Sequence, residues 1–275
     1  MRLMLFFSVL ILFCASAYAV PVKMTAPLQQ EISDGDTVYI GAIGPGQTID
    51  VRIEPIVITG GIYGKGGQYD LATVTQNPPG WTFEPSQQYG NPLQVTITAD
   101  KNAPEGIYST DVTVIDENNG EELGNVTFTL KTNITWDVLD MDVKPTSVTV
   151  GPGQPARFSI TVINKGFASD QFVVSATGAK RWQFVKPIYV PAKSSREIVY
   201  EITAYEEEVY TPTIKVDSIA SPNIHDEQNV SLTIRSDLIG DYRATNQGTL
   251  LFPVFEAPIY SLAGLIAAVL GAFGI

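Results

Sequence analysis

Apolar and polar residues alternate along most of the chain. Leu93, Val95 and Ile97 are separated by polar residues, and residues 157–162 repeat the pattern. A period of two places successive side chains on opposite faces of a strand, so each segment has one face to bury and one face for water. Turn-forming runs such as Asn118-Asn119-Gly120 separate these segments, and no helical period is sustained between the two ends of the chain. The pattern predicts an all-β protein.

Three sequence matches recur, in the same order, about 100 residues apart, which is the size of one immunoglobulin-like β-sandwich. The matching pairs are Gly44–Gln47 with Gly151–Gln154, Trp81–Phe83 with Trp182–Phe184, and Asn125–Thr132 with Asn229–Ser236. An internal repeat of this kind indicates duplication of one structural unit. We therefore expect two tandem immunoglobulin-like β-sandwiches, residues 20–136 and 137–236, with Trp81 and Trp182 at the same position.

The repeated residues resemble a known family. A Gly-Pro-Gly-Gln turn leads into a strand that ends near Asn-x-Gly, as in residues 150–166, and Pro79-Gly80-Trp81 and residues 103–108 supply two further motifs. In these features the chain is similar to exported CARDB-type β-sandwich domains and to the module appended to some secreted α-galactosidases. Residues 206–210 depart from the family pattern. The resemblance implies the fold, and a place among archaeal and bacterial cell-surface membrane proteins, more firmly than any activity.

The N-terminus has the features of a secretory signal peptide. Arg2 precedes an apolar run that ends at Cys14, and Ala17-Tyr18-Ala19 offers small residues at the positions that signal peptidase reads. We expect cleavage after Ala19, so that residues 1–19 are removed. The alternative is an uncleaved N-terminal anchor, but the apolar run is shorter than the ~20 residues that span a bilayer.

The C-terminus ends in an uncharged apolar segment, residues 257–275. As a helix, a segment of this length would cover about 28 Å, close to the ~30 Å of a hydrocarbon core. Its glycines and alanines, and Pro258 near its start, are common in membrane helices. We expect a transmembrane anchor here, preceded by a juxtamembrane linker, residues 237–256. The alternatives are an apolar element packed on a sandwich, or an anchor signal that is replaced by lipid.

Composition narrows the classes of function. The formal net charge of -12 repels phosphate backbones, so nucleic-acid binding is disfavoured. Cys14 is the sole cysteine and would leave with the signal peptide, so the mature chain would contain no disulfide and no thiolate ligand. We expect no cofactor, no metal site and no catalytic residues.

Two kinds of candidate site remain. Asn125, Asn133 and Asn229 each begin an Asn-x-Ser/Thr sequon and are candidate glycosylation sites. The glycine-rich run 60–67 lacks the Ser or Thr and the following helix of a phosphate-binding loop. We interpret it as a hairpin tip, with Gly61, Tyr63 and Lys65 as a candidate contact loop.

Other chemistry-bearing residues have simpler interpretations. His225 stands alone in a polar stretch, which favours a solvated loop residue. Asp137, Asp140 and Asp142 offer oxygen ligands for calcium but lack a defined loop signature, so solvated charge is the default interpretation. Trp81 and Trp182 stand at the same repeat position, which favours core or edge packing over a role as platforms for glycan stacking.

These observations lead to two hypotheses of function. The first is a non-enzymatic protein of the cell surface, anchored by a single membrane pass, whose extracellular domains act as a spacer or as binding and adhesion modules for envelope proteins or surface glycans. The second is an accessory subunit that docks on a larger membrane, secretion or pilus complex. Order in the linker 237–256 would favour the second.

Overall fold

We analysed a computed structural model, which describes residues 20–57, 67–117, 123–178 and 185–236. The described residues form β-strands joined by turns, as the alternating pattern predicts. Within these ranges no helix is long and apolar enough to cross a bilayer. The predicted signal peptide (1–19), linker (237–256) and membrane anchor (257–275) lie outside the described residues.

The first domain, strands β1 to β11, consists of two facing sheets and a short hairpin. One sheet has the order β2-β1-β4-β9-β8, the other has the order β3-β11-β10-β7, and β5 pairs with β6. The strands of this domain are β1 (Val22–Ala26), β2 (Gln30–Ile32), β3 (Thr37–Ile43), β4 (Thr48–Glu54), β5 (Ile56–Val57), β6 (Gly67–Gln68), β7 (Leu71–Gln76), β8 (Thr82–Glu84), β9 (Leu93–Thr98), β10 (Gly106–Ile115) and β11 (Val126–Ile134).

The second domain, strands β12 to β21, has a related arrangement in three hydrogen-bonded sheets. Its sheets have the orders β12-β14-β17, β13-β21-β18 and β16-β15-β19-β20. The strands are β12 (Leu139–Lys144), β13 (Ser147–Val150), β14 (Pro155–Asn164), β15 (Asp170–Thr177), β16 (Lys186–Val190), β17 (Ser194–Thr203), β18 (Val209–Tyr210), β19 (Thr213–Ser218), β20 (His225–Asn229) and β21 (Ser231–Ile234).

Strand pairing follows one topology in both domains. The first strand pairs antiparallel with the strand after the Gly-Pro-Gly-Gln turn, β1 with β4 and β12 with β14. The strand before that turn pairs parallel with the last strand of the domain, β3 with β11 and β13 with β21. Two sheets connected in this way, with a first strand that crosses from one sheet to the other, are typical of immunoglobulin-like sandwiches.

One strand departs from the repeat. After the Trp81 turn, β8 pairs with β9 in the first sheet. In the second domain, β16 pairs with β15 and so belongs to the opposite sheet. The predicted equivalence of Trp81 and Trp182 falls on this element, and Trp182 lies outside the described residues.

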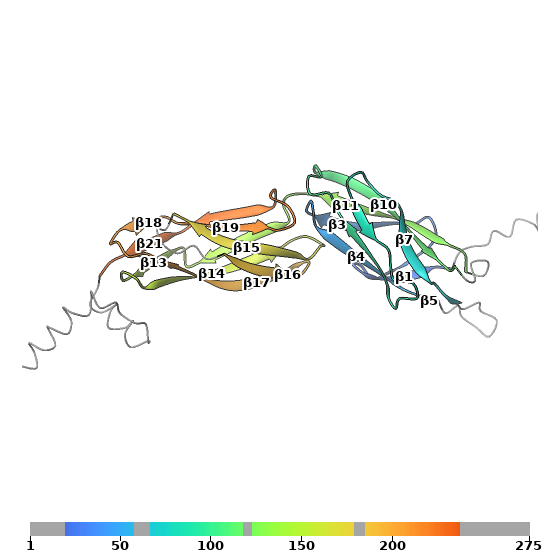
Figure 1. Cartoon of the computed structure of the whole chain (residues 1–275), viewed down its shortest axis with the longest axis horizontal. Helices are drawn as coiled ribbons and strands as arrows, with labels where there is room; N and C mark the ends of the chain where they lie inside the picture. Colours follow the sequence, from blue (N-terminus) through green and yellow to red (C-terminus); the bar gives the residue numbers. More distant parts are fainter. Residues whose placement is uncertain (1–19, 58–66, 118–122, 179–184, 237–275) are drawn as a thin grey trace, which may run out of the picture.

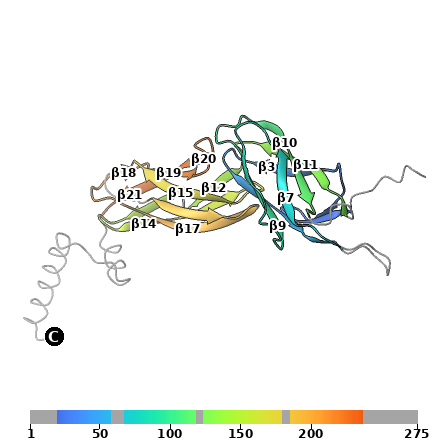
Figure 2. The same ribbon diagram turned by 45° about the vertical axis from the view of Figure 1, so that its right-hand side comes forward.

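Each domain has its own apolar core, built from the inward positions of the alternating strands. In the first core, Val95 of β9 and Phe128 of β11 come from opposite sheets and are both buried. In the second core, the same holds for Phe158 of β14 and Val216 of β19. Trp81 is buried in the first core and its ring lies 5.5 Å from that of Tyr108, so the prediction of core packing is confirmed. Figures 1 and 2 show the two sandwiches end to end, with the described N-terminus and C-terminus at opposite ends.

Candidate functional site: the junction of the two domains

The first turn, Gly44-Pro45-Gly46-Gln47, connects β3 to β4 at the end of the first domain. The backbone N–H of Gln47 donates to the carbonyl of Gly44 (3.3 Å). In return, the backbone N–H of Gly44 donates to Oε1 of the Gln47 side chain (2.8 Å). Gly46 has φ +71, a conformation that favours glycine, and its N–H donates to the carbonyl of Asp100. The turn is thus held by its own side chain and by the loop after β9.

The side chain of Gln47 reaches from this turn into the second domain. Its Nε2 donates to Oδ2 of Asp170 (2.7 Å), which also accepts a hydrogen bond from Oγ of Ser218 (2.6 Å). The other carboxylate oxygen of Asp170 accepts from the N–H of Gln171 (2.7 Å). Gln47, Asp170 and Ser218 are all buried. A buried carboxylate whose acceptors are used by fixed donors stabilises one relative orientation of the groups around it.

Burial raises the pKa of the Asp170 carboxyl above its ordinary value, and the hydrogen bonds from Ser218, Gln47 and Gln171 partly oppose this effect. The three donors offset part of the cost of removing this charge from water, while burial still disfavours the charged form. The network therefore fixes the geometry of the junction, and its net contribution to the free energy of association falls as the carboxyl ionises.

Backbone contacts bring the two domains close on several sides of this network. The Phe167 N–H donates to the carbonyl of Ala42 (2.8 Å), and the Ser221 hydroxyl donates to the carbonyl of Lys101 (3.1 Å). Ala168 of the second domain is packed in the core of the first.

Three glycines allow this close approach, and one of them is Gly44, where a Cβ would overlap the side chain of Ile224 in the second domain. A Cβ at Gly41 would overlap the ring of Phe167, and a Cβ at Gly46 would overlap the carbonyl of Ala220. Larger residues at either place would separate the domains, because the neighbouring atoms belong to the other domain.

The linker between the domains is fixed as well. Oε1 of Glu105 accepts hydrogen bonds from the Trp136 N–H (3.0 Å) and the Thr135 hydroxyl (2.8 Å). These two bonds lower the pKa of the Glu105 carboxyl below its ordinary value. Asp137 then forms an ion pair with Lys165 of the second domain. Both ends of the linker are therefore anchored, one on each domain.

A groove of about 380 Å³ lies beside the junction and is lined by residues of both domains. Asp50 and Arg52 of β4 form one wall, where their charged groups are 3.9 Å apart. Tyr189 of β16 and Lys193 form the opposite wall, and Tyr189 is 56% exposed. The groove thus combines charged groups with an exposed aromatic ring. Within the described residues, no group of three or more His, Cys, Asp or Glu side chains is placed to hold a metal ion.

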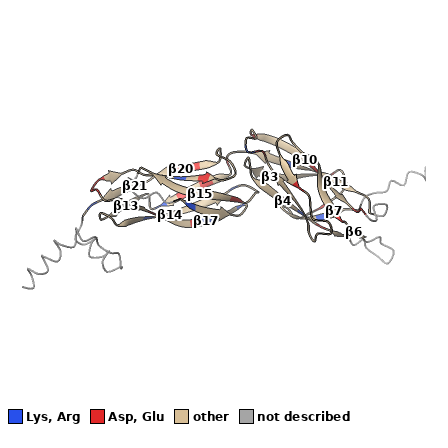
Figure 3. Cartoon of the chain, viewed as in Figure 1, with Lys and Arg blue, Asp and Glu red and all other residues tan. Residues whose placement is uncertain are grey.

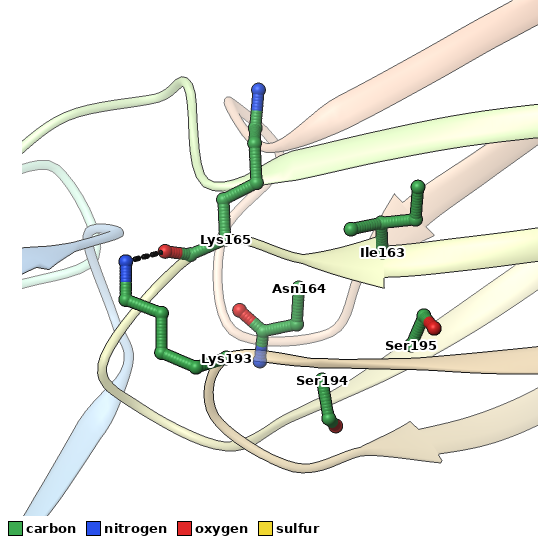
Figure 4. A pocket seen from close by; sticks show the side chains of 6 residues that line it. All are labelled: Ile163, Asn164, Lys165, Lys193, Ser194 and Ser195. Atoms are coloured by element: carbon green, nitrogen blue, oxygen red, sulfur yellow. Dashed lines mark hydrogen bonds between the residues drawn. The ribbon is translucent and has the colours of Figure 1, made fainter.

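A second, more open hollow lies near the same end of the second domain (Figure 4). Lys193 crosses its edge: its Nζ donates to the carbonyl of Lys165 (2.6 Å) and lies 4.2 Å from the centre of the Phe167 ring. Asn164, behind them, donates to the carbonyls of Ala168 (2.8 Å) and Val190 (3.2 Å). These contacts brace the loop that carries Phe167 and Asp170 to the junction.

Of the predicted glycosylation sites, Asn133 lies beside the junction, since it is the register partner of Ala42, whose carbonyl accepts from Phe167. Asn125, Asn133 and Asn229 are exposed, and Oδ1 of Asn229 accepts from the Thr213 hydroxyl (2.7 Å). The predicted contact loop Gly61, Tyr63 and Lys65 lies outside the described residues, so it stays a prediction.

The remaining chemistry-bearing residues have ordinary surroundings. His225 is exposed, with Nδ1 3.2 Å from the carbonyl of Pro222. The three acidic residues considered for calcium have separate contacts: Asp137 with Lys165, Asp142 with Lys144, and Asp140 with the N–H of Met141. Basic and acidic side chains are interspersed over both domains (Figure 3).

The junction could not be predicted from the sequence. The turn Gly44–Gln47 is visible there only as a repeat marker, because Asp170, the partner of Gln47 in the second domain, is 123 positions away in the chain. Asp170 follows Phe167 by three residues and is the first residue of β15. A buried role for that carboxylate had no local signal.

Comparisons with known proteins add little to this geometry. No protein-family model matches the chain, and no curated protein is significantly similar to it. Among solved structures, it aligns with a chimeric titin Z1Z2 carrying a KLER peptide from decorin at 13% identity and a TM-score of 0.35, over 80% of this chain and 99% of that one. The D0-D1 domain of intimin aligns at 12% identity and a TM-score of 0.25, over 70% of this chain and 94% of that one. Because both TM-scores are below 0.5, neither alignment bears on function.

Proposed function

We propose that the protein is a non-enzymatic spacer of the cell surface, in which two β-sandwiches form one stiff rod outside the membrane and the segment 257–275 anchors it. The observation that carries this proposal is the buried hydrogen bond between Gln47 and Asp170. It joins the domains end to end, and a spacer needs a fixed relative orientation to hold a binding surface at a set distance from its anchor.

The direction of the rod supports the same function. The described part of the chain begins at the far end of the first domain and finishes at the opposite end of the second (Figure 1). A membrane anchor that follows Ser236 after a linker would hold the first domain farthest from the bilayer.

Residues of the first domain also form hydrogen bonds with Val20, the expected mature N-terminus. Val20, the residue after the predicted cleavage site, donates from its backbone nitrogen to the carbonyl of Leu123 (3.1 Å). Its own carbonyl accepts from the Tyr69 hydroxyl (2.9 Å). Burial raises the pKa of Tyr69 to about 12, with the charge of Asp116 as a smaller cause, so this hydroxyl stays a donor at all physiological pH values. Val20 is therefore held by the first domain, and we propose that export removes residues 1–19.

Membership of the CARDB-type family is part of this proposal. It is supported by the Gly-Pro-Gly-Gln turns, which connect equivalent strands in both domains.

The location is tested by expression with the signal intact, followed by fractionation of membranes under alkaline wash. We expect the full chain to stay in the pellet, a chain stopped near Gly248 to be released as a folded pair of domains, and the intact mass of the released form to begin at Val20. A truncated form that stays in the pellet, a full chain that is washed off, or a mass that retains Arg2 would contradict the corresponding part of the proposal.

A further inference from the structure

The outer face of the sheet β3-β11-β10-β7 carries an exposed aliphatic side chain among polar ones. Threonine hydroxyls are linked across these strands, Thr75 with Thr113 (3.2 Å) and Thr113 with Thr127 (3.0 Å). On the same face of β10, Ile107 is 71% exposed. An exposed large apolar side chain on a polar face is more informative than a polar one. The apolar surface of Ile107 is left to solvent or to a group outside the sheet.

The strand register places a predicted glycosylation site beside Ile107. Asn133 of β11 is its direct partner in the antiparallel pair, and both side chains are exposed. Opposite residues of such a pair project to the same face, with Cβ atoms about 4.5–5.5 Å apart. Asn133 begins the sequon Asn133-Ile134-Thr135. The first sugar of a glycan on its side-chain nitrogen would therefore be attached within reach of Ile107.

Another large apolar side chain of this face already has a cover. Tyr39 of β3 is 65% exposed, and its register partner on β11 is Lys131. Nζ of Lys131 lies 5.4 Å from the centre of the Tyr39 ring, so a cation and its aliphatic stem lie over the aromatic ring. Ile107 has only the short side chain of Asn133 at the equivalent position, and asparagine by itself leaves it exposed.

A second sequon lies on a strand but has a polar neighbour. The register partner of Asn229 on β20 is Thr213 of β19, whose hydroxyl donates to Oδ1 of Asn229 (2.7 Å). A glycan at Asn229 would meet a hydroxyl group in place of an aliphatic side chain. Asn229 therefore offers a matched comparison, with the same attachment chemistry and no large apolar side chain opposite.

We propose that a glycan carried by Asn133 packs the apolar face of its first sugar ring on Ile107 and thereby stabilises the pairing of β10 with β11. A pyranose ring presents C–H groups on its faces, and contact with an aliphatic side chain removes apolar surface of both from water. The contact would lie beside the junction, because Ala42, the other register partner of Asn133, accepts a hydrogen bond from the Phe167 N–H (2.8 Å). The inference depends on neither the spacer function nor the membrane anchor.

The expected size of the effect follows from the area of the contact. Removal of about 50 Å² of apolar surface from water shifts an equilibrium constant by about tenfold. The contact exists only while β10 and β11 are folded, so it should reduce the opening of these strands. Amide hydrogen exchange in β10 measures this opening. A sugar that extends into solvent would leave the exchange rates unchanged.

The test compares one sequence with and without its glycan. The full chain with its signal peptide carries Asn125→Gln and Asn229→Gln, so that Asn133 is its remaining sequon. It is produced in a host that attaches N-glycans and in a host that does not, and intact mass establishes the occupancy of Asn133. A second pair of samples also carries Ile107→Thr, which keeps a branched side chain suited to a strand and reduces its apolar surface.

In the first pair, we expect the amides of β10 to exchange about tenfold more slowly in the glycosylated chain. In the Ile107→Thr pair, we expect the two forms to exchange at nearly equal rates. The matched control, with Asn125→Gln and Asn133→Gln, carries its glycan at Asn229 and should show no such protection of β19.

Four outcomes would overturn the proposal. The first is an intact mass without a glycan at Asn133 in the glycosylating host, and the second is equal exchange of β10 in the two forms of the first pair. The third is protection that survives Ile107→Thr in full. The fourth is equal protection of β19 by the glycan at Asn229, which would assign the effect to any glycan on a strand.

Discussion

Gln47 and Gln154 occupy the same position in two copies of one turn, and in both the side-chain oxygen accepts a hydrogen bond from the first glycine of the turn. Gln47 is 1% exposed because the second domain covers it, whereas Gln154 is partly exposed. The difference arises from tertiary placement and not from the local sequence. The same turn is therefore buried in one domain and partly exposed in the other.

The close approach at Gly46 gives the first prediction. Gly46→Ala should destabilise the junction, because its methyl group would overlap the Ala220 carbonyl in addition to straining a φ of +71. Gly35→Ala is the matched control: its φ is +83, and nothing lies within 4 Å of the added Cβ. We expect Gly35→Ala to cost about 1–2 kcal/mol from the backbone strain alone and Gly46→Ala to cost more, as measured by denaturant unfolding. Equal losses would show that the domains are not in contact at this point.

The second prediction concerns the carboxyl group of Asp170. Its pKa should exceed the ordinary value, since burial raises it, and Ser218→Ala should raise it further by removal of a hydrogen bond to the charged form. Because the pKa is raised in the folded state, this group's contribution to stability is fully present below the ordinary pKa and is lost as the pH rises through the folded value. Carboxyl carbon chemical shifts followed against pH measure the value. A pKa at or below the ordinary one would contradict the buried geometry.

The third prediction has the opposite sign. The backbone hydrogen bond from Trp136 and the side-chain hydrogen bond from Thr135 lower the pKa of Glu105. The ionised Glu105 carboxylate and its two hydrogen bonds should therefore contribute stability above the ordinary pKa of a glutamate. This contribution should be lost as the pH falls through the lowered pKa. Thr135→Val removes one of the two donors and should move the pKa of Glu105 back toward its ordinary value in the same titration. An unchanged pKa of Glu105 after the substitution would argue against these hydrogen bonds.

The fourth prediction concerns the sequons. The side chains of Asn125, Asn133 and Asn229 are exposed, and Asn133 lies on β11 opposite Ile107, which is 71% exposed. In a host with the glycosylation machinery, we expect glycans at all three, with intact mass falling by one glycan for each single Asn→Gln substitution. A mass that equals that of the bare chain would reject these candidates.

The alternating pattern accounted for much of the fold. Leu93, Val95 and Ile97 were predicted to share a buried face, and they are 0%, 0% and 1% exposed. A period of two is a local property of the sequence, and burial of one face follows directly from it. The prediction of an all-β chain is confirmed for this reason.

Longer-range features could not be predicted. The strand after the Trp81 turn joins the sheet of β9, whereas the corresponding strand of the second domain joins that of β15, although the sequences before them are similar. Edge strands can pair with either sheet, and the choice depends on packing over the whole domain. The junction was missed for a related reason, since Gln47 and Asp170 meet only after both domains have folded.

The central claim is that the two sandwiches form one rigid body, and a distance measurement between them tests it most directly. Ser109 of the first domain and Glu227 of the second are exposed, and each can carry a spin label after substitution by cysteine. In the chain 20–236 we expect a narrow distance distribution by pulsed electron resonance. Gln47→Ala, which removes a hydrogen bond to a buried carboxylate worth about 1–3 kcal/mol, should broaden it, whereas the exposed substitution Gln76→Ala should not. A broad distribution in the unsubstituted protein would contradict the account.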